Sequence, residues 1–518
     1  MARMLAAQAS FAYCPALQPG ADVRGMVNPH TAALEQAANT ASARIIAAAL
    51  VTVTALLCAL FVFCYDDGDH MPPRAPVSVA EAVRAMASDG APRFLYELSC
   101  RVGPVFRLPL PTTRRFYVVA DADVAAAVLA HPLSTTPSLA CAEALMLTTD
   151  ALSIRSTHDA PCEATAWPHL DDARVAAICR THACGLVHNV IAPAALSGAP
   201  VDVCALALRV GLGIICEACL GYVPAAAECA ELSHAVLLAA AQARCAGAPW
   251  LVRALLSPPS VCARAAERSM RFGHTVLANY RQAEAAARAE LHALPIAHFA
   301  HGGTYAHEGA RATALVAFVA AAHSAVASRL AWALHDLAQH AREQTTVRLA
   351  LRGVAEPTAV RELADAIHES MRLHCANQHG CLRLTGCDFA CPARTAGATG
   401  AGAHPRGATR RIPAHSIVLL HAPSILRDAV HFERPNDFLP ARWSGASAPS
   451  PALLGGRECS AHCDQHWHCP PLARAALVAA LAATLTEYEL RVCCPPSSTL
   501  CSTRPPVGLA LRVCRAPS

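Results

Sequence analysis

Residues 451–474 read PALLGGRECSAHCDQHWHCPPLAR, a Gly-Gly turn followed by a dense group of Cys and His side chains. Cysteine and histidine are common ligands of transition metals in proteins. An Ala- and Leu-rich segment, typical of a helix, begins within this stretch and continues beyond it. Alone, the stretch indicates a metal site, and the residues that precede it in the chain decide which kind.

The composition of the chain indicates a large and mainly helical globular protein. Its 518 residues are 54% hydrophobic and 15% charged, too apolar for a disordered protein and sufficient for a large buried core. The apolar residues are mostly Ala, Leu and Val, and only 5% of the chain is aromatic, so helix is favoured over strand. The net charge of +4 rests entirely on Arg, because the sequence contains no Lys. Since no dense basic run is present, we expect no nucleic-acid partner.

The 25 cysteines are scattered along the chain without a repeated spacing. This pattern is unlike that of a small secreted disulfide scaffold. We therefore expect most of the cysteines to be reduced, buried thiols.

The N-terminal part of the chain predicts a membrane anchor. Residues 45–65 carry no charge, and a helix of this length spans about 31 Å, close to the thickness of a bilayer core. A buried core helix is the alternative, but a core helix rarely lacks a polar face. We expect residues 1–44 to form a flexible extension, and the Pro-rich residues 66–76 to form a linker to the globular part.

Residues 77–518 are expected to form a single domain of the α+β class, mainly helical with small β-sheets. Apolar periodicity and breaker residues predict helices at 94–102, 121–129, 201–222, 312–339, 361–373 and 472–490, and strands at 105–110, 116–120 and 416–421. The apolar segment 312–339 is predicted as a central buried helix, with a second membrane span as the alternative. Residues 393–411, rich in Gly, Ala and Thr, are predicted to be a disordered insertion.

Charged and aromatic motifs precede the Cys/His stretch in a characteristic order. Glu369 and Arg372 lie three residues apart in a predicted helix, and therefore on one face of it. FLPAR follows at 438–442, and GGREC at 455–459 lies within the stretch itself. This order resembles that of the cytochrome P-450 (haem-thiolate monooxygenase) family, with its E-x-x-R helix pair, its F-x-P-x-R segment and the G-x-R-x-C end of its haem-binding loop.

The N-terminal half also resembles this family. FLYEL at 94–98, GPVF at 103–106 and YVVAD at 117–121 are similar to its first helix and first sheet. A membrane anchor followed by a Pro-rich hinge is typical of its microsomal members. The resemblance therefore implies a cytochrome P-450-like fold with an N-terminal transmembrane helix.

The resemblance also implies a cofactor, haem b, and residues that hold it. Cys459 would be the axial ligand of the haem iron, with Cys469 as the alternative. Glu369, Arg372 and Arg442 would form a buried ion network that fixes the loop carrying the Cys.

Further residues are assigned to cofactor binding by the same resemblance: Gly455, Arg457, Arg383, Trp167 and Arg174. The family carries W-x-x-x-R to the haem propionates, but here Asp171 stands four residues after Trp167. Arg174 is the nearest match for the missing Arg, and His169 is a second candidate.

The chain departs from the family in its central helix. Where the family has an acid followed by Thr for proton delivery, this sequence has Ser324 followed by Ala325. A Ser hydroxyl donates a hydrogen bond but does not ionise usefully, so Ser324 is a weak catalytic candidate. His323 is a second candidate as a proton relay, with a His packed among its helical neighbours as the alternative.

The sequence of the expected haem-binding loop also differs from the family pattern. Ala452 stands where the family has Phe, Ala461 stands where it has Gly, and an insertion of about eight residues, 462–469, precedes the helix. The insertion contains further possible ligands, for which zinc binding and an exposed loop are the alternatives: His462, Cys463, His466, His468 and Cys469.

The expected function is insertion of one oxygen atom into a lipophilic substrate of the sterol or fatty acid class. The resemblance implies electrons from an NADPH-dependent reductase, and a single-pass protein of the endoplasmic reticulum membrane with a cytosolic catalytic domain. Two alternatives remain. Family members that rearrange or dehydrate hydroperoxides also lack the acid and hydroxyl pair, which favours an isomerase, dehydratase or peroxygenase. The altered loop and the missing propionate residue favour a degenerate haem-binding protein without turnover.

Overall fold

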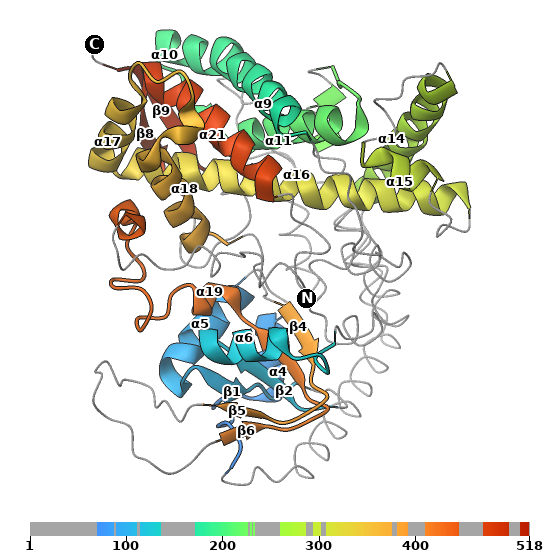
Figure 1. Ribbon diagram of the computed structural model, residues 1–518, viewed down its shortest axis with the longest axis vertical. Coiled ribbons are helices and arrows are strands. Elements are labelled where there is room, and N and C mark those ends of the chain that lie inside the picture. The colour runs from blue at the N-terminus through green and yellow to red at the C-terminus, as the bar shows by residue number, and fades with distance from the viewer. Residues whose placement is uncertain are drawn as a thin grey trace, which may run out of the picture.

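The computed structural model describes residues 70–86, 90–110, 114–135, 171–225, 228–229, 232–233, 260–285, 294–301, 307–375, 381–391, 410–444, 470–496 and 508–516. These residues form two regions, a larger helical one and a smaller one built around β-strands (Figure 1). The predicted extension at 1–44 and the predicted anchor at 45–65 lie outside the described residues.

The β-rich region is organised around a four-stranded sheet with the order β1-β2-β7-β4. Its strands are β1 (Val105–Arg107), β2 (Phe116–Val119), β4 (Cys381–Leu384) and β7 (Ile417–Leu420). β2 and β7 pair in parallel, with Phe116 opposite Ile417, whereas the β1–β2 and β7–β4 pairs are antiparallel. The centre of the sheet therefore joins two segments that lie about 300 residues apart in the chain.

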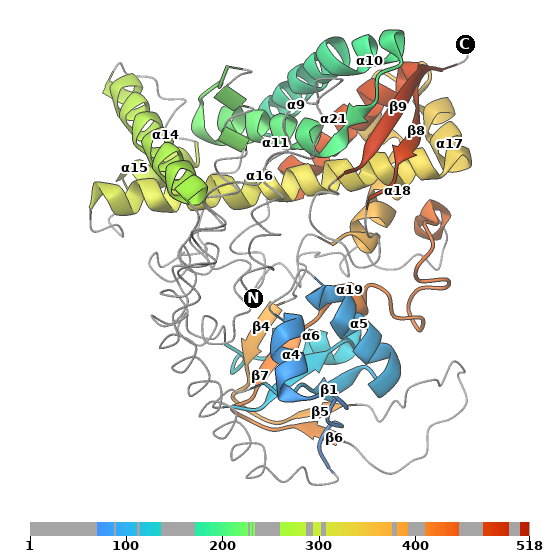
Figure 2. The same cartoon turned by 180° about the vertical axis from the view of Figure 1, so that it is seen from behind.

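Both faces of this sheet are covered. The covering elements are α4 (Val79–Met86), α5 (Ala91–Val102), α6 (Ala122–Ala130), β5 (Phe389–Cys391), β6 (Arg410–Ile412) and α19 (Ala422–Ile425). Phe116 and Val118 pack with α4 and α5, while Tyr117 and Val119 pack with α6, β5 and β6. The alternation follows from the two-residue period of a strand. Views from opposite sides agree, with α6 nearest the viewer in Figure 1 and α4 nearest in Figure 2.

The helical region is built around α16, which runs through it from end to end (Figure 1). Its helices are α9 (Asp172–Leu186), α10 (Ala192–Ser197), α11 (Val203–Leu220), α14 (Ser260–Ala285), α15 (Ile296–His301), α16 (Glu308–Gln339), α17 (Ala341–Leu351), α18 (Arg361–Leu373) and α21 (Pro470–Glu487). α11, α14, α18 and α21 all pack against α16. Leu315, Val319 and Leu330 on α16 are fully buried, so this helix is the core of the region.

A three-stranded antiparallel sheet with the order β3-β9-β8 closes the helical region at its C-terminal end. Its strands are β3 (Val201–Asp202), β8 (Tyr488–Cys494) and β9 (Ala510–Arg515). The Gln344 side chain on α17 donates to the carbonyl of Leu490 at 3.0 Å and accepts from its N–H at 2.8 Å. This buried amide ties β8 to the helices.

Among the described residues, three helical segments are long and apolar enough to cross a membrane, as judged from length and composition: Asp172–Ser197, Val203–Leu220 and Glu308–Gln339. In the last of these, 93% of the most apolar 18-residue window is buried inside the protein, and in Val203–Leu220 the share is 72%. Packing within the protein therefore accounts for the apolar character of α11 and α16. For α16 it favours the predicted central helix over a second membrane span.

The predicted class, mainly helical with small β-sheets, is confirmed. The helix predicted at 361–373 has those bounds, whereas the helix predicted at 312–339 begins earlier, at Glu308. The strand predicted at 105–110 ends at Arg107. Pro109 explains the shorter strand, because proline has no N–H to donate to the next strand.

The described part of the predicted linker at 66–76 packs against β1. The N–H of Ala75 donates to the carbonyl of Arg107, and the N–H of Arg107 donates to the carbonyl of Pro73, each at 2.8 Å. Ala75 is buried. The packed part of the protein therefore includes these linker residues.

The predicted insertion at 393–411 lies outside the described residues, except for its last two positions. Arg410 and Arg411 belong to β6. The N–H of Arg411 donates to the carbonyl of His70 at 2.8 Å, so the end of the insertion contacts the beginning of the described chain.

The cysteines are thiols, not disulfides, wherever the structure describes their side chains. Five are buried, namely Cys179, Cys216, Cys219, Cys229 and Cys391, and four are exposed, namely Cys100, Cys184, Cys493 and Cys494. Burial raises the pKa of Cys229 to about 11, so its thiol stays neutral at physiological pH. The expectation of reduced thiols agrees with the described residues. Five of the thirteen described thiols are buried, which is fewer than the expected majority.

The crossing of α11 over α16 requires a residue without a side chain. A Cβ atom at Gly211 would lie 3.2 Å from the backbone oxygen of His323 and 3.3 Å from the backbone nitrogen of Ala327. Both contacts are with the backbone of α16, which cannot turn aside as a side chain can. Gly185 on α9 is a contrasting position, because its nearest neighbour would be the Asn189 side chain at 3.8 Å.

We expect Gly211→Ala to be less stable than Gly185→Ala by about 1–3 kcal/mol, the usual cost of an extra methyl group in a packed core. Both substitutions gain the same helix propensity, so their difference isolates the steric contact. Denaturant unfolding of the two variants and the parent measures it. Equal stability of the two variants would contradict the tight α11–α16 crossing.

Candidate functional site

A buried ion pair lies on one face of α18. The Arg372 guanidinium donates to Glu369 through Nε at 3.0 Å and through Nη2 at 2.8 Å, and both side chains are 0% exposed. Their spacing of three residues places them side by side on the helix. The two parallel hydrogen bonds form the bidentate geometry that makes Arg–carboxylate pairs strong.

Glu369 accepts three further hydrogen bonds from the segment that precedes the Cys/His stretch. The donors are Arg442 Nε at 3.0 Å, the backbone N–H of Leu439 at 3.0 Å and Trp443 Nε1 at 2.9 Å. Arg442 and Trp443 lie on a 3₁₀ helix, Pro440–Trp443. Five donors thus compensate for the burial of a single carboxylate.

Arg372 binds three carbonyl groups of the same segment. Its Nη1 donates to Leu426 at 2.8 Å and to Pro435 at 2.7 Å, and its Nη2 donates to Asp437 at 3.2 Å. The guanidinium also lies over the Phe432 ring, 5.0 Å from the centroid. This one side chain therefore fixes the course of residues 426–437.

The end of the segment is tied to α18 as well. The Ser444 hydroxyl donates to Asp365, and the Arg361 guanidinium donates to the Ser444 carbonyl. Arg442 adds a hydrogen bond from Nη1 to the carbonyl of Glu433 at 2.8 Å. The structure thus brings together the three predicted network residues and anchors residues 426–444 on α18. The next residues, 445–469, lie outside the described chain.

The predicted haem loop and its ligands belong to that undescribed segment: Ala452, Gly455, Arg457, Cys459, Ala461, His462, Cys463, His466, His468 and Cys469. Trp167 and His169 also lie outside the described residues. The chain is described again from Pro470, where α21 begins directly after Cys469. α21 packs against both α16 and α18, so the helix that follows the predicted loop belongs to the helical core.

Two other predicted cofactor residues lie in different regions. Arg383 is on β4 in the β-rich region, and it is 3% exposed. Arg174 is half-buried on α9 in the helical region. Figure 1 shows β4 within the β-rich region and α9 within the helical region.

The predicted proton-transfer residues lie on α16. His323 is fully buried, and its Nε2 is 3.0 Å from the carbonyl oxygen of Leu208 on α11. The imidazole therefore joins two core helices. Ser324 is also on α16, and its side chain is outside the described part of the structure.

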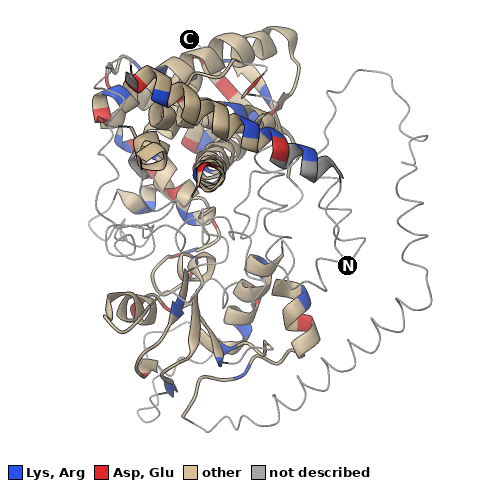
Figure 3. Ribbon diagram, turned by 90° about the vertical axis from the view of Figure 1, so that its right-hand side faces the viewer, with Lys and Arg blue, Asp and Glu red and all other residues tan. Residues whose placement is uncertain are grey.

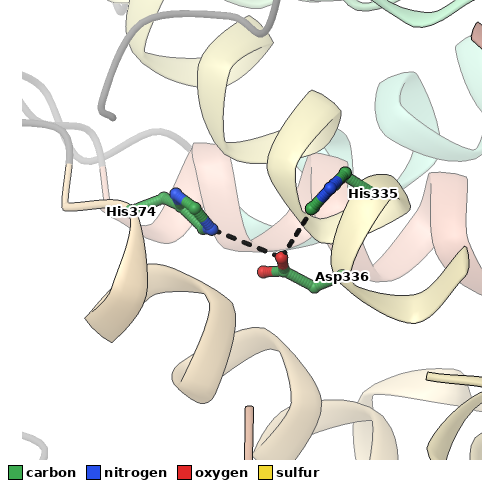
Figure 4. A group of neighbouring side chains, drawn as sticks. All are labelled: His335, Asp336 and His374. Atoms are coloured by element: carbon green, nitrogen blue, oxygen red, sulfur yellow. Dashed lines mark hydrogen bonds and ion pairs between the residues drawn. The ribbon is translucent and has the colours of Figure 1, made fainter. Parts of the chain in front are cut away.

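A second polar cluster, which was not predicted from the sequence, lies in the core. The Asp336 Oδ1 atom is 3.0 Å from His335 Nδ1 and 3.3 Å from His374 Nε2, and all three side chains are buried (Figure 4). His335 and Asp336 lie on α16, and His374 follows the end of α18. The adjacent His335 and Asp336 in a mainly apolar helix are a local signal for two of the three residues, but nothing in that signal indicates that His374 lies beside them.

The charge state of this cluster follows from its surroundings. Burial alone raises the pKa of Asp336, but attraction to His374 and hydrogen bonds from His335 and His374 outweigh it and hold the pKa well below its usual range. Asp336 is therefore a carboxylate anion. The His374 ring stacks on Trp332, with centroids 3.9 Å apart and planes 5° from parallel, so its orientation is fixed.

No protein-family model matches the chain, and no curated protein sequence matches it significantly.

We expect Glu369→Gln to lower the free energy of unfolding by roughly 3–5 kcal/mol, because it leaves two buried guanidinium groups without their shared anion. Arg434→Ala is the matched control, since its pair with Asp437 is exposed and worth at most about 1 kcal/mol. Denaturant unfolding measures both. A cost for Glu369→Gln no larger than that of the control would show that the network does not hold the fold.

Proposed function

We propose that the chain is a divergent haem-thiolate oxidoreductase of the cytochrome P-450 type. It would insert one oxygen atom into a lipophilic substrate, of the sterol or fatty acid class, with electrons from an NADPH-dependent reductase. The observation that carries the proposal is the ion network of Glu369, Arg372 and Arg442. It anchors on α18 the segment that leads into GGREC at 455–459.

The residues of this chain fit haem b by the chemistry of their donors. Haem carries two propionates, which need cationic partners, and Arg383, Arg457 and Arg174 are the candidates. Arg383 lies buried on β4, and a guanidinium can bind a carboxylate through two parallel hydrogen bonds. Gly455 and Trp167 complete the proposed cofactor contacts.

Two cysteines, Cys459 and Cys469, are alternative candidates for the axial ligand. Gly455 and Arg457 stand in the expected positions before Cys459, which supports that residue. The start of α21 at Pro470 supports Cys469, because a helix N-terminus stabilises a thiolate anion. We propose Cys459 as the ligand and keep Cys469 as the alternative. When bound, a thiolate-ligated haem supplies electron density that favours O–O cleavage.

The network residues would contribute by positioning the segment that leads into the loop. Glu369 and Arg372 anchor residues 426–444 on α18, and α21, which follows the loop, packs against α16 and α18.

A second candidate function uses a hydroperoxide in place of dioxygen. Ser324 and Ala325 replace the acid and hydroxyl pair, and His323 Nε2 contacts the Leu208 carbonyl. Proton delivery by the central helix is therefore weak, which favours a hydroperoxide isomerase, dehydratase or peroxygenase. The third candidate is a haem-binding protein without turnover.

We further propose that residues 45–65 anchor the protein in the endoplasmic reticulum membrane by a single pass, with the catalytic domain in the cytosol. A membrane position suits a substrate that partitions into lipid. Docking of an acidic reductase would rely on Arg alone, because the chain has no Lys. Figure 3 shows these Arg residues interspersed with acidic residues over both regions.

We expect the purified, reduced full-length protein to give a carbon monoxide difference spectrum with the Soret band of a thiolate-ligated haem. Cys459→Ala should abolish this band, whereas Cys469→Ala should keep it. Cys184→Ala is the control, because that thiol is exposed on α9. The reverse pattern would assign the ligand to Cys469, and absence of the band in the unaltered protein would contradict both enzyme proposals.

We expect turnover to require NADPH and reductase if dioxygen is the oxidant. Consumption of a fatty acid hydroperoxide without NADPH would instead identify the second candidate function. A thiolate spectrum with neither activity would identify the third.

A further inference from the structure

We propose that His335, Asp336 and His374 bind one divalent transition-metal ion of the zinc type, which joins α16 to α18. None of the three residues takes part in the proposed haem site or in the Glu369 network. The proposal therefore stands or falls independently of the haem.

The spacing of the three side chains fits a metal ion. One ligand atom from each residue lies within 4.8 Å of the other two, and the two Asp336–His distances are 3.0 and 3.3 Å. Bonds from zinc to imidazole nitrogen and carboxylate oxygen are about 2.0–2.2 Å, which places neighbouring ligand atoms about 3–3.5 Å apart. Both Asp336–His distances lie in this range, and the two imidazole nitrogens, which lie within 4.8 Å of each other, would have to move into it.

The chemical types of the three donor groups also suit a divalent metal ion. Two imidazoles and one carboxylate suit zinc and other divalent first-row metals, and they leave further coordination positions open. The carboxylate supplies one negative charge, which partly neutralises the two positive charges of the ion. A water molecule or a further ligand would complete the coordination sphere.

Hydrogen bonds within the cluster do not satisfy all of its polar atoms. Asp336 Oδ2 and His335 Nε2 are buried, and neither has a hydrogen-bond partner within the described part of the chain. The Asp336 side chain is only 4% exposed. Buried polar atoms in proteins are nearly always paired, and a bound ion can take the place of a missing hydrogen-bond partner. An ion bound by both carboxylate oxygens would pair Oδ2 as well as Oδ1.

The cluster is held rigidly before any ion binds. His335 and Asp336 are consecutive residues of a long core helix, and the His374 ring is fixed by stacking on Trp332. The backbone N–H of His374 donates to the Ser370 carbonyl at 2.9 Å, which ties it to the end of α18. Preorganised ligands favour tight binding, because few rotamers are lost.

Zinc content of the purified full-length protein tests the proposal. We expect one zinc per chain to remain after gel filtration in metal-free buffer, counted separately from haem iron by mass spectrometry. Asp336→Asn should weaken zinc binding about tenfold or more, since even the loss of an outer partner of a metal site costs that much. His421→Gln is the matched control, because this buried His lies in the β-rich region and contacts Ser424.

A second measurement covers the case in which Asp336→Asn fails to fold. A zinc chelator should lower the melting temperature of the unaltered protein and of His421→Gln, and zinc should restore it. Absence of zinc from the unaltered protein, together with no effect of chelator or added zinc on melting, would overturn the proposal. The cluster would then be a carboxylate paired with histidines. Full retention of zinc by a folded Asp336→Asn variant would overturn it as well.

Discussion

The carboxylate of Glu369 is the group on which the arrangement of the segment 426–444 depends. It is buried without exposure to solvent, and it accepts hydrogen bonds from two guanidinium groups, an indole and a backbone N–H. Such a site is stable only when every donor is in place, because the desolvation of an ion is repaid only by complete pairing. The donors come from α18 and from Leu439–Trp443, so the helix and the segment can form their contacts only together.

The C-terminal end of α18 also makes a contact with α16, apart from the contacts with the segment 426–444. Arg372 turns toward the segment 426–444, while His374, two residues later, reaches Asp336 on α16. The helix is therefore a bridge between the core helix of the helical region and the segment that leads toward the Cys/His stretch. Residues 445–469 leave from this anchored segment and return at α21, which packs against α16 and α18. Whatever the stretch binds, both of its attachments are to the same rigid group of helices.

Local patterns in the sequence were enough to predict the class and most of the long elements. Periodic apolar residues predicted α18 with its bounds, and the three-residue spacing of Glu369 and Arg372 placed their side chains together. The start of α16 was missed, because its N-cap is His307, whose ring accepts from the Ala310 N–H and which is not a usual capping residue. The His335, Asp336 and His374 cluster was also missed, since it exists only where two helices meet. No local pattern in the sequence indicates such a meeting.

The parallel pairing of β2 with β7 has a consequence for how the protein is made. The partner strand of β2 leaves the ribosome only after about 300 more residues have been synthesised. Until then, the apolar faces of β1, β2 and α5 have no completed sheet to cover them, and long-range strand pairing is slow and prone to aggregation. The helical region is likewise interrupted by the strands from β4 to β7. A single proteolytic cut between the regions would therefore release neither of them whole, and the two must mature as one unit.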